Sequence, residues 1–206
     1  CCNPIASIKV EANLITKAYP DHTFETKTVE SDMVTAEIDA FTKQFETQND
    51  KTFKFINNGM FGFTAYDAVK YFEDITISKK DHSIEIPDMY YAVYQNIIAI
   101  NHFKNEAYLF AHCFERESNI EAIDHLIKMQ SFSSYDFKSK GKISSNLTDK
   151  AFKSNVDLAK KHCNRGDVFQ LVLSKKFQQD FKGDDFNVHR ALRSINPSHF
   201  LFYFDY

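Results

Sequence analysis

Apolar and polar residues alternate along two short segments near the start of the chain, residues 5–10 and 14–19. An alternation with a period of two is typical of strands with one buried and one solvent-facing side, so we expect the two segments to pair as a hairpin. Farther along, Val34, Ile38 and Phe41 recur at the spacing of one helical face. This spacing predicts an amphipathic helix.

The middle of the chain combines short and long apolar segments. Residues 53–56 predict a short strand, and the asparagines and glycines of residues 57–62 predict a turn that leads into a helix over residues 65–72. Residues 90–102 and 107–114 are rich in aromatic and β-branched side chains, and a short polar link separates them. They predict two long paired strands.

Two helices with a polar segment between them come next. Ser118 begins a capping-box sequence before an apolar helical stripe that ends near Gln130. Residues 131–145 hold many serines and lysines and few apolar groups, so we expect a linker there. Thr148 predicts the start of the next helix, which should bury one apolar stripe, and Gly166 predicts its end.

The last part of the chain predicts a strand, a helix and a second strand. Residues 168–177 form an apolar run that is typical of a buried strand. Asp184 or Asp185 can cap a helix over residues 188–195, whose apolar side chains should point inward and which ends before Pro197. The apolar residues after Pro197 predict the second strand. Because helices and strands are mixed without regular alternation, the predicted fold class is α+β, with antiparallel sheets covered by helices.

Both ends of the chain indicate an internal piece of a longer protein. The final apolar strand reaches the chain end with nothing to pair with it or cover it. Residues 1–4 show neither an initiator methionine nor a signal-peptide pattern before the first strand. We therefore expect segments of the parent protein to be missing from this sequence.

Composition narrows the class of protein. The chain is 43% hydrophobic and 26% charged with a net charge of -3, which is ordinary for a soluble globular protein. There is no basic patch that would predict nucleic acid as a partner, and the apolar runs are far shorter than the roughly 20 residues that cross a membrane. The spacing of the four cysteines matches neither a metal knuckle nor a disulfide framework. It predicts buried reduced thiols and a cytoplasmic location.

From the residues alone, no catalytic site can be assembled. Gly59 and Gly62 lack the spacing and the Lys-Ser/Thr pair of a phosphate-binding loop, so a tight turn is the better interpretation. The eight histidines fall singly, without the paired spacing of metal ligands, so no metal site is predicted within this span. Spacing reveals no Ser/His/Asp or Cys/His arrangement either.

Three separated stretches carry a resemblance to a known enzyme family. The first is GMFGFTAYDAVKYFE at residues 59–73. The second runs from IPDMYY at residues 86–91 to NIIAINHFK at residues 96–104. The third and most specific is GDVFQLVLS at residues 166–174, followed by ALRSINPS and FYFD. Together, and in this order, they resemble component I of anthranilate synthase, a chorismate-utilising enzyme of tryptophan biosynthesis.

The resemblance implies a lyase reaction in which chorismate and ammonia yield anthranilate and pyruvate. It implies Mg²⁺ as the cofactor, on the carboxylate of the substrate, and a glutamine amidotransferase subunit as the partner that supplies ammonia. In the family, the residues that bind Mg²⁺ and chorismate lie almost entirely in a later part of the chorismate-binding domain. Within this span we therefore assign no catalytic residue and no metal ligand, and we expect this piece alone to be inactive.

The resemblance also implies how the chain is divided. Residues 1–130 correspond to an N-terminal regulatory domain of the tryptophan-binding type, which is incomplete at its start. Residues 131–145 correspond to a linker, and residues 146–206 to the first part of the chorismate-binding catalytic domain. The whole would be a truncated part of the β-sandwich fold of the chorismate-utilising enzymes.

Gln170 is the position in the third stretch with a chemical argument. Relatives that add water to chorismate resemble this segment but carry a lysine there, which can deprotonate water as a general base. A neutral glutamine cannot do so, whereas ammonia is already a nucleophile. Gln170 therefore favours the amine-adding branch as a pocket-lining residue, although an ordinary polar residue satisfied inside a sheet is the competing interpretation.

The Asn-Pro-Ser turn carries the predicted inhibitor site. In the family, tryptophan inhibits by binding between the N-terminal domain and this turn together with the residues just after it. The matching positions in this chain are Asn196, Pro197, Ser198, His199, Phe200 and Leu201. The last three depart from the usual Pro-Tyr-Met, and His199 replaces a rigid ring with a titratable side chain. The other half of that pocket, a Leu-Leu-Glu-Ser segment, would precede Cys1.

Two other functions stay open from the sequence. Component I of aminodeoxychorismate synthase, which adds an amine to chorismate in the folate pathway, is the nearest alternative. The helix at residues 67–72 and the strand at residues 96–104 favour anthranilate synthase over it. The second alternative is a non-catalytic module that binds an amino acid, because nothing in this span can catalyse unaided.

Overall fold

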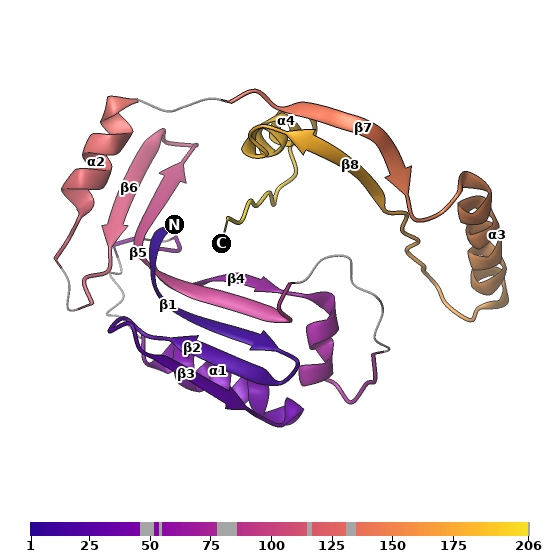
Figure 1. Ribbon diagram of the computed structural model, residues 1–206, viewed down its shortest axis with the longest axis horizontal. Coiled ribbons are helices and arrows are strands. Elements are labelled where there is room, and N and C mark those ends of the chain that lie inside the picture. Colours follow the sequence, from indigo (N-terminus) through magenta and orange to yellow (C-terminus); the bar gives the residue numbers. More distant parts are fainter. Residues whose placement is uncertain (46–51, 54, 78–85, 115–116, 131–134, 206) are drawn as a thin grey trace. The chain divides into compact units, whose positions relative to one another are not determined.

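The computed structural model describes residues 1–45, 52–53, 55–77, 86–114, 117–130 and 135–205 (Figure 1). The chain forms two compact units, residues 1–131 and residues 132–206, called unit 1 and unit 2 below. Each unit has its own sheet and its own helices.

Unit 1 is built on a six-stranded antiparallel sheet (Figure 1). Its strands are β1 (Cys2–Glu11), β2 (Leu14–Ala18), β3 (Phe24–Thr28), β4 (Met60–Thr64), β5 (Met89–Asn101) and β6 (Glu106–Ala111). The order across the sheet is β3-β2-β1-β5-β4, and β6 also pairs with β5. The predicted first hairpin and the two predicted long paired strands are confirmed as β1–β2 and β5–β6.

The β1–β2 hairpin results directly from its sequence. Ala12 and Asn13, the two residues between the strands, have positive φ angles of 47° and 69°, which a tight two-residue hairpin turn requires. This turn sets the register in which Val10 faces Ile15. Both side chains are 1% exposed, so the alternation puts its apolar residues in the core.

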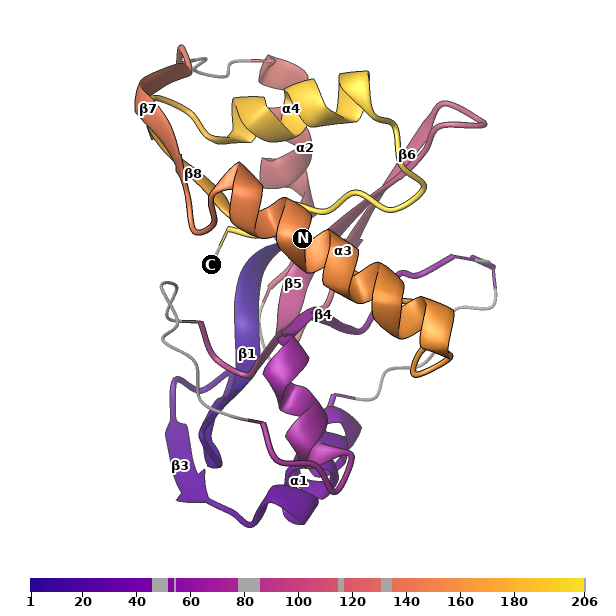
Figure 2. The same cartoon turned by 90° about the vertical axis from the view of Figure 1, so that its right-hand side faces the viewer.

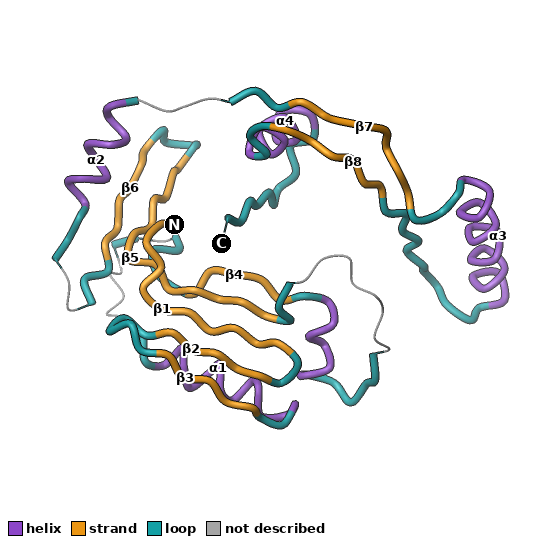
Figure 3. The backbone as a smooth tube through the Cα atoms, viewed as in Figure 1, coloured by secondary structure: helices purple, strands orange, loops and turns teal. Residues whose placement is uncertain are grey.

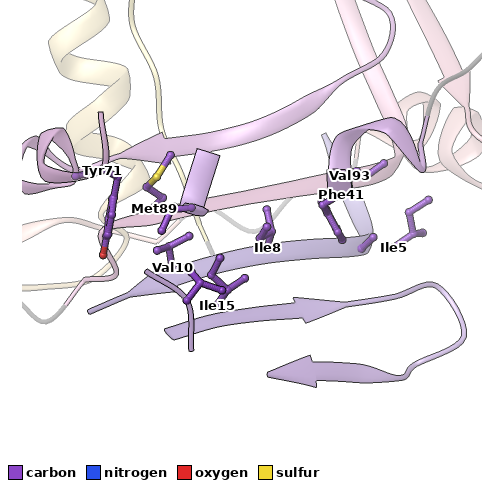
Figure 4. Packing of buried hydrophobic residues seen from close by; sticks show 12 residues of the cluster. Ile5, Ile8, Val10, Ile15, Phe41, Tyr71, Met89 and Val93 are labelled. Atoms are coloured by element: carbon purple, nitrogen blue, oxygen red, sulfur yellow. The ribbon is translucent and has the colours of Figure 1, made fainter. Parts of the chain in front are cut away.

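The described residues of unit 1 include two α-helices and two short 3₁₀-helices. They are η1 (Ser31–Met33), α1 (Val34–Lys43), η2 (Tyr66–Tyr71) and α2 (Ile120–Met129). Val34 and Phe41 of α1 are fully buried, which confirms the predicted amphipathic helix. Figure 4 shows Phe41 in one cluster with side chains of β1, β2 and β5. The core of unit 1 therefore lies between one face of the sheet and α1.

A buried lysine joins α1 to the sheet. The Lys17 side chain of β2 is only 7% exposed, and its Nζ lies 2.7 Å from Oε2 of Glu37 on α1. The other carboxylate oxygen of Glu37 lies 2.8 Å from the Nζ of Lys27 on β3. The hydrogen bond from Lys17 has the largest effect on the pKa of Glu37, and together with the one from Lys27 it lowers that pKa to about 2. Glu37 therefore stays ionised and neutralises the buried charge of Lys17.

Gly62 lies in strand β4, so the prediction of a turn over residues 57–62 is wrong for its second half. Gly62 pairs with Tyr91 of β5. A Cβ at this position would lie 1.9 Å from the Tyr90 carbonyl oxygen, so the backbones approach more closely here than any side chain permits. The glycine marks a close approach of two strands and not a chain reversal.

Three other local predictions for unit 1 need correction. Phe53 and Phe55 are not in a strand, and Lys54 between them lies outside the described residues. The rings of Phe53 and Phe55 pack against Tyr108 of β6, at centroid distances of 5.5 and 5.1 Å. The helix predicted over residues 65–72 is the shorter η2. α2 begins after Asn119, and Ser118 contributes only a long hydrogen bond of 3.4 Å from the Ile120 N–H. The predicted end of α2 near Gln130 is confirmed.

The described part of unit 2 comprises a two-stranded antiparallel sheet and two helices. They are β7 (Lys138–Ser145), α3 (Asp149–Arg165), β8 (Phe177–Lys182) and α4 (Phe186–Ile195). α3 is one uninterrupted helix (Figure 2). The Thr148 side chain accepts a hydrogen bond of 3.2 Å from the Ala151 N–H, and Gly166 ends the helix with a φ of 80°. Both predicted ends of α3 are thus confirmed.

The strand predictions in unit 2 are largely wrong. The composition of residues 131–145 predicts a linker, and residues 131–134 of it lie outside the described residues, but residues 138–145 form β7. Residues 168–176 and 201–205, which the sequence predicts as strands, form none (Figure 3). A strand requires a neighbour for its backbone groups. Among residues 168–176, only Lys176 has such a neighbour. Its N–H donates to Asn146 Oδ1, and its carbonyl accepts from the Asn146 N–H. Apolar character alone therefore did not make these segments strands.

The apolar side chains of the unit 2 helices are not buried as predicted. Val188, Leu192 and Ile195 of α4 are 47%, 48% and 81% exposed. None of the described residues of unit 2 is buried. Unit 2 thus presents an apolar helical stripe without a core behind it.

The cysteines are free, but they are not the buried thiols that the sequence predicts. Cys2 is partly buried, and the other three are exposed. Within the described ranges, no helix combines the length and the apolar character needed to cross a bilayer.

We expect Glu37→Gln to lower the free energy of unfolding by about 3 kcal/mol, because it leaves the charge of buried Lys17 without a full counter-charge. Wild-type stability should also fall as the pH drops below the ordinary glutamate pKa of roughly 4.3. The reason is that the folded-state pKa of Glu37 is about 2, so its ion pairs stabilise the fold above the ordinary value and are lost in acid. Urea denaturation at several pH values measures both effects.

Asp39→Asn is the matched control for Glu37→Gln. Asp39 lies on the same helix and pairs with Lys43, but both side chains are more than half exposed. We expect this change to cost less than about 0.5 kcal/mol. Equal costs for the two variants would contradict a special role for Glu37.

Gly62→Ala should destabilise unit 1 by about 2 kcal/mol or more, because the added methyl collides with the Tyr90 carbonyl and forces β4 away from β5. Gly166→Ala is the control. A Cβ at Gly166 meets nothing within 4 Å, so only its positive φ opposes the change, at about 1 kcal/mol. Amide hydrogen exchange should show lost protection in β4 for Gly62→Ala alone. Unchanged protection would contradict the close-approach explanation.

Candidate functional site

The predicted inhibitor residues form one continuous segment at the end of α4. The helix ends at Ile195, and the Ser198 N–H donates a hydrogen bond of 2.8 Å to the Asn196 carbonyl. Residues 196–200 are exposed, and Leu201 is partly buried. These residues are neighbours along the chain, and among the described residues of unit 2 they line no pocket.

The chain beyond this segment folds back onto α4. The Tyr203 hydroxyl donates a hydrogen bond of 3.3 Å to the carboxylate of Asp185, the residue that precedes the helix. Its ring packs edge-on against Phe186 at 5.0 Å and lies 5.8 Å from the His189 ring. Residues 196–203 therefore form a loop that leaves the end of α4 and returns to its start.

Gln170 is exposed and lies outside the strands of unit 2. The neighbouring Phe169 and Val172 are 98% and 85% exposed. The sequence predicts that Gln170 lies in a buried strand that forms a pocket wall. Residues 168–176 are all described, and none of them is in a strand. The chemical argument for Gln170 thus rests on its identity and not on its surroundings in unit 2.

Two of the three stretches that carry the resemblance meet in unit 1. The strand of the first stretch, β4, pairs with β5 of the second. The helix of the first stretch, η2, also contacts the second, because the Tyr71 hydroxyl donates a hydrogen bond of 2.6 Å to Asp88. Lys70 bonds the same oxygen at 2.9 Å. Sequence reasoning missed Asp88, although a lone carboxylate directly before a long apolar strand was a visible signal.

Two of the cavities in unit 1 are lined by described residues. One, of about 220 Å³, is lined mainly by apolar side chains, with Asn58, His112 and Cys113 at its wall. His112 Nε2 lies 3.0 Å from the Asn57 carbonyl, so this nitrogen is tied to the backbone. The second, of about 520 Å³, lies beside Phe55 and Tyr108. In neither lining does a described hydrogen bond join a nucleophile to a base, and we assign no chemistry to these cavities.

The described residues also bring together no group of three or more His, Cys, Asp or Glu side chains that could hold a metal ion. A Mg²⁺ ion needs several oxygen ligands at short distance. The described part of the chain therefore does not fit the Mg²⁺ that the resemblance implies, and we assign no reaction step in this span to a metal.

Comparison with known proteins identifies relatives along most of the chain. The anthranilate synthase component 1 of Lactococcus lactis is 31% identical over 161 residues, which cover 72% of this chain and 34% of the relative. The aminodeoxychorismate synthase component 1 of Bacillus subtilis is 26% identical over 214 aligned positions, and the match covers 98% of this chain and 44% of the relative. The chain thus spans less than half the length of these relatives.

A solved structure supports the fold. The crystal structure of anthranilate synthase component I from Streptococcus pneumoniae matches all of this chain and 46% of its own, with a TM-score of 0.68 and 24% sequence identity. The match agrees with the predicted α+β class with antiparallel sheets. The family described as chorismate binding enzymes matches residues 6–206, which is nearly the whole chain. The protein therefore belongs to the chorismate-binding enzyme family.

Proposed function

We propose that this chain is part of component I of an anthranilate synthase, which converts chorismate and ammonia to anthranilate and pyruvate. The observation that carries the proposal is the 31% identity to the Lactococcus lactis protein of that name. An Arabidopsis thaliana anthranilate synthase alpha subunit, 28% identical over 169 residues, supports it from a distant organism. Because the chain spans about a third of these proteins, the activity belongs to the full-length parent.

Gln170 supports an aminating reaction. The resemblance matches Gln170 to a position where related water-adding enzymes carry lysine. A lysine can act as a general base toward water, whereas a glutamine has no proton-accepting group at neutral pH. Ammonia needs no such base, so a glutamine at this position is compatible with amination and unsuited to hydration.

The proposal includes the partners and the regulation that the resemblance implies. A glutamine amidotransferase subunit would supply ammonia, and Mg²⁺ would be held by residues outside the described ones. Tryptophan would act as a feedback inhibitor at residues 196–201, with its other half-site outside this chain. The enzyme would act in the cytoplasm. The 206-residue chain alone would be inactive.

Component I of an aminodeoxychorismate synthase is the second candidate. The observation that favours it is coverage, because the Bacillus subtilis protein of that name aligns with 98% of this chain. Both enzymes add an amine to chorismate, and they differ in whether pyruvate is then eliminated. A non-catalytic amino-acid-binding module is the third candidate, since the described residues contain no assembled catalytic group.

Product analysis of the full-length protein tests the first two candidates. We expect anthranilate when the protein is incubated with chorismate, Mg²⁺ and an ammonium salt, and we expect no product from the 206-residue chain under the same conditions. Liquid chromatography with fluorescence detection measures anthranilate directly. Accumulation of aminodeoxychorismate would support the second candidate instead, and turnover by the short chain would contradict its assigned inactivity.

Tryptophan inhibition tests the predicted inhibitor site. In the full-length protein, Ser198→Ala and Leu201→Ala should each raise the tryptophan concentration for half-inhibition by about tenfold, the effect of roughly 1.4 kcal/mol of lost binding. Ser194→Ala, in the last turn of α4, is the control and should leave inhibition unchanged. If both site variants are inhibited like the wild type, the site is wrong. Tight tryptophan binding without any turnover of chorismate would favour the non-catalytic module.

A further inference from the structure

Three separate segments of unit 1 meet at one oxygen of Asp88. Oδ2 of this residue accepts hydrogen bonds from the Tyr71 hydroxyl at 2.6 Å, from Lys70 Nζ at 2.9 Å and from the Ala12 backbone N–H at 3.1 Å. Ala12 belongs to the β1–β2 turn, Lys70 and Tyr71 belong to η2, and Asp88 directly precedes β5. The Asp88 side chain is only 17% exposed, so these bonds are largely shielded from water.

The Tyr71 hydroxyl extends this network to a fourth segment. While it donates to Asp88, it also accepts a hydrogen bond of 3.2 Å from the Asn13 N–H. The Asn13 side chain in turn bonds the Ser31 hydroxyl at 3.1 Å, at the start of η1. The Asn13 carbonyl accepts a bond of 3.0 Å from the Val29 N–H. Hydrogen bonds therefore run without a break from Asp88 through Tyr71 and Asn13 to the beginning of η1.

Both ends of η2 are attached to Asp88. The N–H of Ala65, the residue before the helix, donates a bond of 2.8 Å to the Asp88 carbonyl. Tyr71, the last residue of the helix, bonds the Asp88 side chain. A 3₁₀-helix of six residues has poor internal hydrogen-bond geometry and depends on outside contacts for its stability. Asp88 supplies such a contact at each end.

We propose that Asp88 is a latch that fastens η2 and the β1–β2 turn to the start of β5, so that these two segments open and close together. Its buried carboxylate is the shared acceptor of both segments. When it is lost, the Tyr71 hydroxyl loses its acceptor and the Asn13 N–H loses a fixed partner. The latch acts in the folding of unit 1 and does not depend on the proposed function.

The electrostatics keep the latch carboxylate charged at neutral pH. Partial burial by itself would raise the pKa of Asp88, but the hydrogen bonds from Tyr71, Lys70 and the Ala12 N–H outweigh it and lower that pKa. Lys70 is the only charged group whose hydrogen bond to Asp88 is described, and Tyr71 faces it as a neutral donor. Asp88 thus remains an ionised acceptor, and charge-assisted bonds of this kind are stronger than neutral ones.

Hydrogen exchange at single amides of the 206-residue chain, followed by NMR at neutral pH, tests the latch. The informative amides are Asn13 in the turn, Ala68 in η2, and Phe72, which follows η2 and bonds the Val69 carbonyl within it. None of them bonds the Asp88 side chain directly. In Asp88→Asn we expect all three to exchange about ten- to a hundredfold faster, the loss that a charged hydrogen bond implies. Amides in the middle of α1 should keep their wild-type rates.

Tyr71→Phe tests the same network and still gives a result if the Asp88→Asn variant does not fold. It removes only the hydroxyl and keeps the ring, and it should accelerate exchange in the turn and in η2 by similar factors. Asp124→Asn is the matched control, because Asp124 pairs with Lys128 on the exposed surface of α2. This change should leave the turn and η2 unaffected.

The latch is wrong if Asp88→Asn and Tyr71→Phe accelerate exchange in only one of the two segments. It is equally wrong if they accelerate neither, or if Asp124→Asn produces the same pattern. Should Asp88→Asn unfold unit 1 as a whole, the rates in Tyr71→Phe decide between joint and independent opening.

Discussion

The organisation of unit 1 depends on the backbone pairing of β5 with three other strands. β1 occupies one edge of β5, whereas β4 and then β6 occupy successive parts of the other edge. Pairing on both edges demands a close approach of backbones, and Gly62 permits it where β4 passes Tyr90. The core between the sheet and α1, and the attachment of η2 through Asp88, both presuppose this arrangement.

The elements whose signals are local could be predicted from the sequence. The β1–β2 hairpin, α1, α3 with Thr148 and Gly166 at its ends, and the β5–β6 pair all result from side-chain period or from capping and turn residues. Elements that depend on distant partners were missed. The sequence predicts Gly62 in a turn, but it lies in a strand, because β4 pairs closely with β5 there. Residues 168–175 are apolar like a strand but have no described strand neighbour. Periodicity contains no information about which segments will lie side by side.

The candidate site shows the same division. The resemblance identified the Asn-Pro-Ser segment and Gln170, and in unit 2 both are exposed. Asp88, which joins two of the resembling stretches, was not predicted from the sequence. It connects segments only through hydrogen bonds from Ala12, Lys70 and Tyr71, which are distant in sequence. The two units also differ in kind. Unit 1 buries an apolar core, whereas none of the described residues of unit 2 is buried. The chain spans less than half the length of the relatives described above.

Pyruvate release during turnover of chorismate tests the central functional claim most directly. Anthranilate formation eliminates the enolpyruvyl group of chorismate, so the full-length protein supplied with chorismate and ammonia should release pyruvate in equimolar amount to the chorismate consumed. A coupled lactate dehydrogenase assay measures this ratio. Consumption of chorismate without pyruvate, or no consumption at all, would contradict the assignment to anthranilate synthase.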